Sequence, residues 1–326
     1  MKKSIIKNNI LVTGGYGILG CHLVNFLSND INNNIYLLDR NSKSKKLLSL
    51  NIPKKIKIIN GNFNKYKSLL SIIKNKKINI IFHLGAITQV IDAYKSPIET
   101  FRTNIIGTIN ILEAVRKINK NIIIIYSSSD KAYGEMNKSH YTENSKLHGE
   151  FPYDVSKSSS DLICQTYSKT YSLKIGIIRS GNIYGPGDFN LDRLVPGLLV
   201  SVIRNKNIKI RSNGRLRRDY LYVDDVAKGY ISLMKKMIRD SRKLFIYNLG
   251  SRYNFNAIEL VQKVYKILNI KKLKPVIQNK FTKIEIKNQK LNYKKASKEL
   301  NWLPKTSFEN GIKKSFAWYN NNASLF

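Results

Sequence analysis

The chain has 326 residues, of which 57 are basic and 21 acidic, so its formal net charge at pH 7 is +36. A hydrophobic content of 42% excludes an intrinsically disordered chain, and two cysteines exclude a disulfide framework. The apolar runs are too short for a membrane-spanning helix of about 20 residues, and we expect a cytoplasmic protein. The lysines are scattered, which favours compositional bias over a nucleic-acid partner, although the charge favours anionic substrates.

The first part of the chain alternates apolar strands with amphipathic helices. Strands are predicted over residues 10–13, 35–39, 56–59, 78–83, 122–126 and 174–178, and helices over 19–27, 66–74, 103–118 and 153–171. This order predicts an α/β fold of the Rossmann type, a doubly wound parallel sheet with helices on both faces. Beyond residue 179 the elements are shorter and mixed. We predict an NAD-binding domain over residues 1–179, to which 219–250 return, and a smaller mixed α/β substrate-binding lobe over 180–326.

Three glycines, Gly14, Gly17 and Gly20, follow the first predicted strand and precede the first predicted helix. Glycines at this spacing permit a tight turn, a close approach to a pyrophosphate and close helix packing, whereas a glycine turn without a ligand is the alternative. Asp39 ends the next strand nineteen residues after Gly20, where an acidic residue binds the ribose of NAD. The carboxylate favours NAD over NADP, although the neighbouring Arg40 could accommodate a 2′-phosphate.

Two polar segments are the catalytic candidates. Tyr153 and Lys157 stand four residues apart on a predicted helix, so a lysine ammonium could favour the phenolate of a tyrosine base. Residues 127–134 follow an apolar strand, and there Asp130 and Lys131 place an acid beside a base. A surface tyrosine–lysine pair and a polar loop with an ion pair are the alternatives. The four histidines show no metal-ligand spacing, so we expect no metal site.

Together these segments resemble the sugar-nucleotide epimerases and dehydratases of the extended short-chain dehydrogenase/reductase family. The resemblance covers nearly the whole chain. Its motifs are Thr13-Gly14-x-x-Gly17-x-x-Gly20, His83-Leu84-Gly85-Ala86, Asn104-x-x-Gly107-Thr108, Ser127 to Gly134, Tyr153-x-x-x-Lys157, Arg179-x-x-Asn182-x-Tyr184-Gly185, Arg218-Asp219-Tyr220-Leu221 and Leu300-Asn301-Trp302-x-Pro304.

The resemblance implies a transient oxidation of a nucleotide-linked sugar at C4 by NAD. Tyr153 is then expected to remove the 4-hydroxyl proton, Lys157 to hold the nicotinamide ribose and lower the tyrosine pKa, and Ser129 to bind the 4-oxygen. The implied substrate contacts are Ser129, Asn182, Arg193 and Arg218. The implied cofactor contacts are Gly14, Tyr16, Gly17, Ile18, Gly20, Asp39, Arg40, Asn62, Phe63, Leu84, Gly85, Ala86, Asn104, Tyr153 and Lys157.

Positions 130 and 131 separate the reaction types of this family. Its 4-epimerases carry small or neutral residues there, whereas Ser/Thr-Asp-Lys resembles the CDP-glucose 4,6-dehydratases. The expected reaction is therefore a 4,6-dehydration to a 4-keto-6-deoxy sugar nucleotide. Asp130 would protonate the departing 6-hydroxyl, and Lys131 would act at C5 as a base or as support for the enolate. A 4-epimerase and a non-catalytic nucleic-acid-binding relative are the alternatives. The resemblance also implies a homodimer that pairs residues 103–118 and 153–171 of each subunit.

Overall fold

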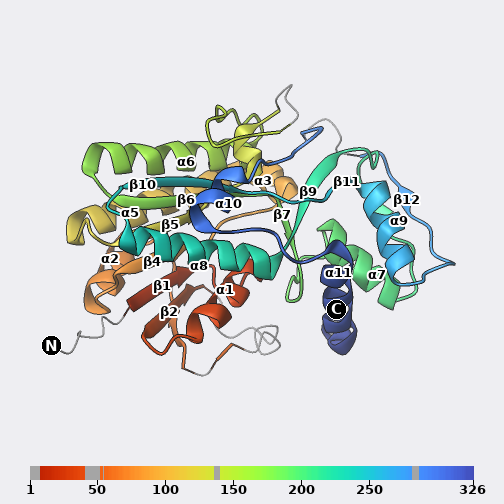
Figure 1. The fold of residues 1–326 in the computed structure, drawn as a ribbon, viewed down its shortest axis with the longest axis horizontal. Coiled ribbons are helices and arrows are strands. Elements are labelled where there is room, and N and C mark those ends of the chain that lie inside the picture. The colour runs from red at the N-terminus through yellow and green to blue at the C-terminus, as the bar shows by residue number, and fades with distance from the viewer. Residues whose placement is uncertain (1–7, 41–51, 54, 136–139, 281–285) are drawn as a thin grey trace.

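The computed structural model describes residues 8–40, 52–53, 55–135, 140–280 and 286–326. Its central feature is a sheet of seven strands in the order β3-β2-β1-β4-β5-β6-β10, with every neighbouring pair parallel (Figure 1). The first six strands follow the order of a dinucleotide-binding fold, which confirms the predicted Rossmann-type sheet. The strands are β1 (Asn8–Thr13), β2 (Asn33–Asp39), β3 (Lys57–Asn60), β4 (Ile80–His83), β5 (Ile123–Ser127), β6 (Lys174–Ser180) and β10 (Leu244–Leu249).

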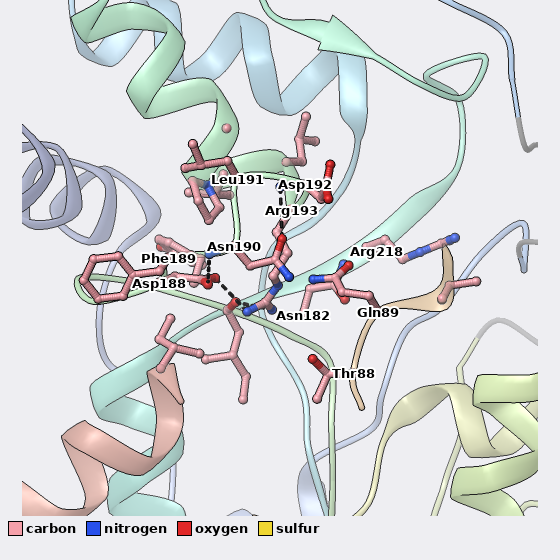
Figure 2. A pocket seen from close by; sticks show the side chains of 18 of the residues that line it. Thr88, Gln89, Asn182, Asp188, Phe189, Asn190, Leu191, Asp192, Arg193 and Arg218 are labelled. Atoms are coloured by element: carbon pink, nitrogen blue, oxygen red, sulfur yellow. Dashed lines mark hydrogen bonds and ion pairs between the residues drawn. The ribbon is translucent and has the colours of Figure 1, made fainter. Parts of the chain in front are cut away.

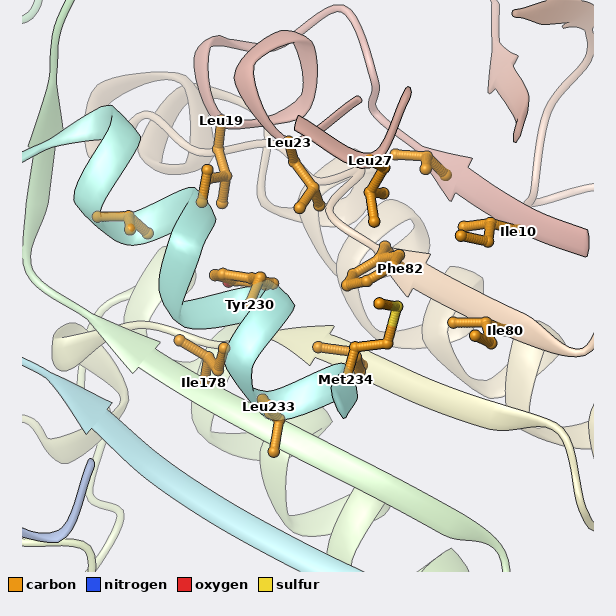
Figure 3. Packing of buried hydrophobic residues seen from close by; sticks show 14 of the residues in the cluster. Ile10, Leu19, Leu23, Leu27, Ile80, Phe82, Ile178, Tyr230, Leu233 and Met234 are labelled. Carbon is orange, nitrogen blue, oxygen red and sulfur yellow. The ribbon is translucent and has the colours of Figure 1, made fainter. Parts of the chain in front are cut away.

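Helices cover both faces of this sheet because its inner strands are apolar on both sides. The helices α1 (Ile18–Ser28) and α8 (Val223–Arg239) pack on one face, as Figure 3 shows for Leu23, Tyr230 and Phe82. The helices α2 (Tyr66–Asn75), α5 (Gly107–Ile118) and α6 (Pro152–Tyr171) pack on the other face. Successive residues of β1 alternate between the two cores, with Ile10 in the first and Leu11 in the second.

The chain returns to the sheet late in the sequence. After β9 (Arg217–Tyr222), α8 packs against α1, and β10 then pairs with β6, so that Leu244 lies beside Ile175. The short helix α10 (Lys294–Leu300) packs against α8 and β10. The division of the chain into a cofactor domain and a substrate lobe stays a prediction.

The remaining elements gather at one end of the molecule, where Figure 1 shows α7, α9 and α11 together. Most of them share a third hydrophobic core. These elements are α7 (Leu194–Ile203), α9 (Ala257–Ile267), α11 (Phe308–Asn321), a sheet of β11 (Asn254–Asn256), β9 and β7 (Asn182–Tyr184), and the parallel pair β8 (Lys209–Ile210) and β12 (Val276–Ile277). The short 3₁₀ segment η5 (Ala323–Leu325) follows α11. Among the residues described above, no helix combines the length and the apolar character needed to cross a membrane.

The helix predicted over residues 103–118 begins differently from the prediction. A short α3 (Val90–Lys95) and α4 (Pro97–Phe101) lead into η2 (Arg102–Ile106), which is a π-helix, and α5 follows it without a break. The wider turn of η2 places Asn104, whose side-chain oxygen accepts from the Ile87 amide at 2.8 Å. The same side chain donates to the Ile87 carbonyl at 3.0 Å and to Ser156 Oγ at 2.9 Å. Asn104 thus fastens the loop after β4 to α6.

Candidate active site

A cavity of about 1010 Å³ lies beyond the carboxyl ends of the parallel strands, the usual ligand position on such sheets. Its walls come from the loops after β1, β4, β5 and β6, the start of α6 and the segment before α7. The cavity brings together most of the predicted site residues. These are Gly14, Tyr16, Gly17, Ile18, Gly20, Leu84, Gly85, Ala86, Ser129, Asp130, Lys131, Tyr153, Lys157, Asn182, Arg193 and Arg218.

The glycine loop is shaped by backbone contacts that leave no room for side chains. Gly14 has φ +67°, and a Cβ atom there would lie 2.7 Å from the Gly85 Cα. A Cβ atom on Gly20 would collide with the Gly14 carbonyl oxygen. Gly17 precedes α1 without a side-chain cap, so the amides of the first helical turn have no side-chain acceptor. This backbone cradle suits a pyrophosphate at the helix N-terminus.

A buried hydrogen-bond chain fixes the two loops beside this cradle. The Gly85 amide donates to Thr13 Oγ1 at 3.1 Å, and Thr13 Oγ1 lies 2.8 Å from His83 Nδ1. His83 Nε2 lies 3.1 Å from Thr108 Oγ1, which donates to the Asn104 carbonyl at 2.6 Å. Burial lowers the pKa of His83 to about 3. The neutral ring therefore accepts at Nδ1 and donates at Nε2, linking β1, β4 and α5.

Asp130 lies at the start of the 3₁₀ segment η3 (Asp130–Tyr133), which follows β5. Ser129 Oγ donates to Asp130 Oδ1 at 3.0 Å and accepts from the Lys131 amide at 3.2 Å. The Asp130 residue is 2% exposed, and its Oδ2 atom has no hydrogen-bond partner among the described residues. Burial raises the pKa of this carboxyl, against the nearby charges of Lys131 and Arg218. Burial therefore favours the protonated form of this carboxyl, which is the form that can donate a proton.

Tyr153 and Lys157 lie on the first turns of α6, and both side chains are buried. Burial raises the pKa of the Tyr153 hydroxyl, and a hydrogen bond with Ser129 opposes this rise. Lys157 Nζ donates to the Ser127 carbonyl at 2.8 Å and lies 5.2 Å from the ring centre of Tyr126. Burial lowers the pKa of Lys157 to about 8. The expected lowering of the tyrosine pKa by Lys157 stays a prediction, because burial dominates the pKa of Tyr153 and the Lys157 ammonium is directed at a carbonyl.

Three of the predicted substrate residues, Asn182, Arg193 and Arg218, line the same cavity as η3. Figure 2 shows these three side chains. Arg193 donates to Asp188 Oδ2 at 2.7 Å and to the Ile183 carbonyl at 2.6 Å, so the loop before α7 is fixed by its own ion pair. Arg218 is buried and donates to the backbone carbonyl of Arg217 at 2.8 Å.

Five predicted cofactor residues, Asp39, Arg40, Asn62, Phe63 and Asn104, do not line the cavity. Asp39 ends β2 close enough to Tyr16 for its charge to add to the rise in the tyrosine pKa, after burial. Phe63 packs edge-on against His83 with ring centres 5.2 Å apart. Asn62 accepts a backbone amide of its own turn at 2.9 Å. The cofactor contacts of all five residues stay predictions. The side-chain amide of Asn104 is hydrogen-bonded to Ile87 and Ser156.

Sequence reasoning missed several cavity residues. Thr88 and Gln89 follow β4 and project towards Asn182 (Figure 2). Four basic residues also line the cavity, and we call them the basic wall. They belong to no recognised motif and stand out in the sequence only as a local run of basic residues. They are Arg204, Lys206, Lys209 and Arg211. Gln289, which contacts Lys131 at 3.1 Å, was missed because 158 residues separate the two in sequence.

Comparisons with known proteins agree with this geometry. A family model described as GDP-mannose 4,6 dehydratase matches residues 11–315. A dTDP-D-glucose 4,6-dehydratase of Dictyostelium discoideum is 27% identical, with 100% of this chain and 84% of that protein covered. A dTDP-glucose 4,6-dehydratase of Escherichia coli is also 27% identical, with 96% of this chain and 94% of that protein covered.

Solved structures include both reaction types. A dTDP-glucose 4,6-dehydratase of Bacillus anthracis in complex with NAD has a TM-score of 0.85 at 26% identity, covering 98% of each chain. A UDP-glucose 4-epimerase of Thermotoga maritima with UDP-glucose has a TM-score of 0.87 at 26% identity, covering 97% of this chain and 99% of that chain. The fold, the cavity and the match over residues 11–315 lead to one conclusion. The chain belongs to the GDP-mannose 4,6 dehydratase family.

Proposed function

We propose that the protein is an NAD-dependent nucleotide-sugar 4,6-dehydratase. The observation that carries this proposal is Asp130, a buried carboxyl with a raised pKa that lies in the cavity beside Ser129 and Lys131. An elimination needs a proton donor at the leaving oxygen, whereas an epimerisation does not. The dehydratases among the relatives support the same reaction.

The described residues fit NAD. The backbone cradle of Gly14, Gly17 and Gly20 leaves room for a pyrophosphate, and Asp39 ends the strand beside it. The Tyr16 hydroxyl is buried in this region without a hydrogen-bond partner in the part of the chain that the structure describes. Lys157 lines the same cavity, where it would hold the nicotinamide ribose. When bound, NAD supplies the hydride acceptor for C4 of the sugar.

The side chains around C4 would act before the elimination. Tyr153 takes the proton of the 4-hydroxyl, and Ser129, which shares a hydrogen bond with Tyr153, holds the 4-oxygen. Because burial raises the pKa of Tyr153, the phenolate must be stabilised by positive charge that arrives with the cofactor and from Lys157.

The 3₁₀ segment would act after C4 has become a ketone. The ketone acidifies the C5 proton, which Lys131 removes, and Asp130 protonates the hydroxyl that departs from C6. The product is a 4-keto-6-deoxy sugar nucleotide.

The nucleotide would lie towards the basic wall of the cavity. In this proposal Arg218 and Arg193 bind the diphosphate, and Asn182 contacts the substrate beneath the sugar. All three residues line the cavity. CDP-glucose is the substrate that the Asp130–Lys131 pair favours, whereas the relative and the neighbour named above are a dTDP-D-glucose 4,6-dehydratase and an epimerase solved with UDP-glucose. We also propose that residues 1–179, to which 219–250 return, form the NAD-binding domain, and that 180–326 otherwise form the substrate-binding lobe.

A 4-epimerase is the second candidate, favoured by the structural likeness to the Thermotoga maritima epimerase. The experiment that separates the two incubates the purified protein with CDP-, dTDP-, GDP- and UDP-hexoses and follows the products by NMR. A 4-keto-6-deoxy sugar from one nucleotide is expected. A 4-epimer, or no product from every nucleotide, would overturn the dehydratase proposal.

We further propose a homodimer through α5 and α6. Support comes from large apolar side chains that are exposed on and beside these helices, where α3, α4 and η2 pack against α6. They are Tyr94, Ile98, Ile106, Leu162 and Tyr171. A cytoplasmic location is proposed because Cys21 and Cys164 are both buried free thiols.

A further inference from the structure

The side chain of Gln289 contacts η3, although the two are far apart in the sequence. Lys131 Nζ donates to Gln289 Oε1 at 3.1 Å. Gln289 is 0% exposed, and Lys131 is buried at the wall of the cavity. A buried amide oxygen opposite a lysine that lines a catalytic cavity directs that lysine and restricts its rotamers.

The backbone around Gln289 is held firmly, so the oxygen of its side-chain amide is a fixed acceptor. The backbone amide of Gln289 donates to the Arg217 carbonyl of β9 at 3.1 Å, and the backbone carbonyl of Gln289 accepts from Asn254 Nδ2 at 2.7 Å. Two residues later, the Leu291 amide donates to Asp219 Oδ2 at 2.9 Å. The segment is therefore tied to β11 and to β9, and β9 carries part of the cavity wall.

We infer that Gln289 is a positioning residue for the elimination, and that its amide oxygen holds the Lys131 amine towards C5 of the sugar. The inference rests on the proposed dehydratase function. An amide oxygen orients the amine without bringing a negative charge of its own. A carboxylate at this position would stabilise the ammonium form and hinder its use as a base.

The elimination is the step that depends on this contact. The C5 proton passes to the Lys131 amine, and the electron pair of the C5–H bond forms the C5–C6 double bond. The C6–O bond breaks, and the departing hydroxide takes the carboxyl proton of Asp130 and leaves as water. Lys131 ends as an ammonium and Asp130 as a carboxylate, and these opposite charges stabilise each other.

Other charged groups face this pair and are common to every variant tested. Arg218 of β9 lowers the pKa of Asp130 through its charge, and the charge of Asp130 in turn raises the pKa of Asp219 of β9 and of Tyr153 of α6. A change confined to Gln289 leaves all of them in place. Any shift in the pH dependence of C5 proton removal then reports on the contact between Gln289 and Lys131.

The test compares three variants of the full-length enzyme with NAD and its nucleotide sugar. Gln289→Met keeps the approximate shape without a strong acceptor, and Gln289→Glu replaces the neutral acceptor by a carboxylate. Asn288→Glu is the matched control, because it adds the same charge one residue earlier on an exposed side chain. Three quantities are measured against pH: reduction of NAD at 340 nm, deuterium exchange at C5 and release of the keto sugar.

For Gln289→Met we expect C5 exchange to slow about 10- to 100-fold. For Gln289→Glu we expect the pH at which the C5 exchange rate rises to move up by about one unit or more, because a carboxylate favours the ammonium form of Lys131. NAD reduction should stay within about twofold in all three, and the control should match the wild type. The inference is overturned if the C5 exchange rate of Gln289→Glu rises at the same pH as in the wild type. It is also overturned if Gln289→Met exchanges at the wild-type rate. Equal losses of NAD reduction and exchange would show a merely structural role and overturn it too. A wild type that forms no keto sugar would instead refute the proposed function, and the inference with it.

Discussion

At the scale of single residues, burial moves the ionisable groups of the cavity towards their neutral forms. Burial raises the pKa of Asp130 and of Tyr153, and it lowers the pKa of Lys157 to about 8. A carboxyl that keeps its proton can donate one, and a phenol that keeps its proton must wait for a positive charge before it can act as a base. Cofactor binding would therefore activate Tyr153, while burial still favours the protonated form of Asp130 that the later step needs.

Asp130→Asn should separate the two halves of the reaction. The amide keeps the shape of the side chain but cannot supply a carboxyl proton, so release of the keto sugar should fall about 10²- to 10⁴-fold. Reduction of NAD on mixing with substrate should persist, because Tyr153 is unchanged. Absorbance at 340 nm follows the first half, and NMR of the sugar follows the second. Turnover within about tenfold of the wild type would mean that Asp130 only binds hydroxyls, as in an epimerase.

The roles of single residues were predicted where they depend on neighbours in sequence. Ser129, Asp130 and Lys131 are adjacent, and Tyr153 and Lys157 share one helical face, so their joint position in the cavity followed from local order. Burial energies depend on the whole fold, so no local pattern could give the raised pKa of Tyr153. The contact of Gln289 with Lys131 likewise depends on how β9 positions a distant segment.

At the scale of helices and strands, apolar runs predicted the parallel strands because both faces of an inner strand are buried. Each of the six strands predicted in the first part of the chain is present, within a few residues at its ends. The π-helix η2 was missed, because its apolar spacing reads as an ordinary helix and its cause is the fit of Asn104 between Ile87 and Ser156.

His83 shows how one side chain links several of these elements and should make folding sensitive to acid. Its pKa is about 3 in the folded protein, against about 6.5 in an unfolded chain. Between these values only the unfolded chain binds the proton. The free energy of unfolding therefore falls as pH drops through this window, by about 2 kcal/mol from pH 6.5 to 4.5.

His83→Gln should remove this contribution. The variant should be less stable than the wild type at pH 7, because the link between Thr13 and Thr108 is weakened, but its loss of stability between pH 6.5 and 4.5 should be about 2 kcal/mol smaller. Urea denaturation at the two pH values measures both quantities. His148→Gln is the control, since His148 is exposed and its replacement should leave the wild-type pH dependence. The same drop in all three proteins would contradict the prediction.

At the scale of the whole molecule, the net charge is +36, and basic residues also form one wall of the cavity. Such a field attracts a nucleotide diphosphate before any contact forms, and salt screens it, as the Debye length falls from about 10 Å at 0.1 M to about 3 Å at 1 M. We expect kcat/KM to fall about three- to tenfold over this range while kcat changes little. Steady-state kinetics at both salt concentrations test this, and an equal fall in kcat would point to the chemistry rather than to encounter.

The exposed apolar side chains make the assembly testable as well. Leu162 on α6 and Ile238 on α8 are each 50% exposed, but only Leu162 lies on the helix proposed to pair with a second subunit. A charge placed in a buried interface loses its water without gaining a partner, whereas a charge on a free surface stays hydrated.

Leu162→Glu should therefore yield a monomer, and Ile238→Glu should keep the mass of the wild type. Light scattering coupled to size exclusion measures the mass, and circular dichroism verifies that both variants fold. The matched exposure of the two sites means that a general effect of surface charge would alter both variants alike. A dimer that survives Leu162→Glu, or a wild type that is already monomeric, would rule out pairing through α5 and α6. In that case the exposure of Tyr94, Ile98, Ile106, Leu162 and Tyr171 would need another explanation.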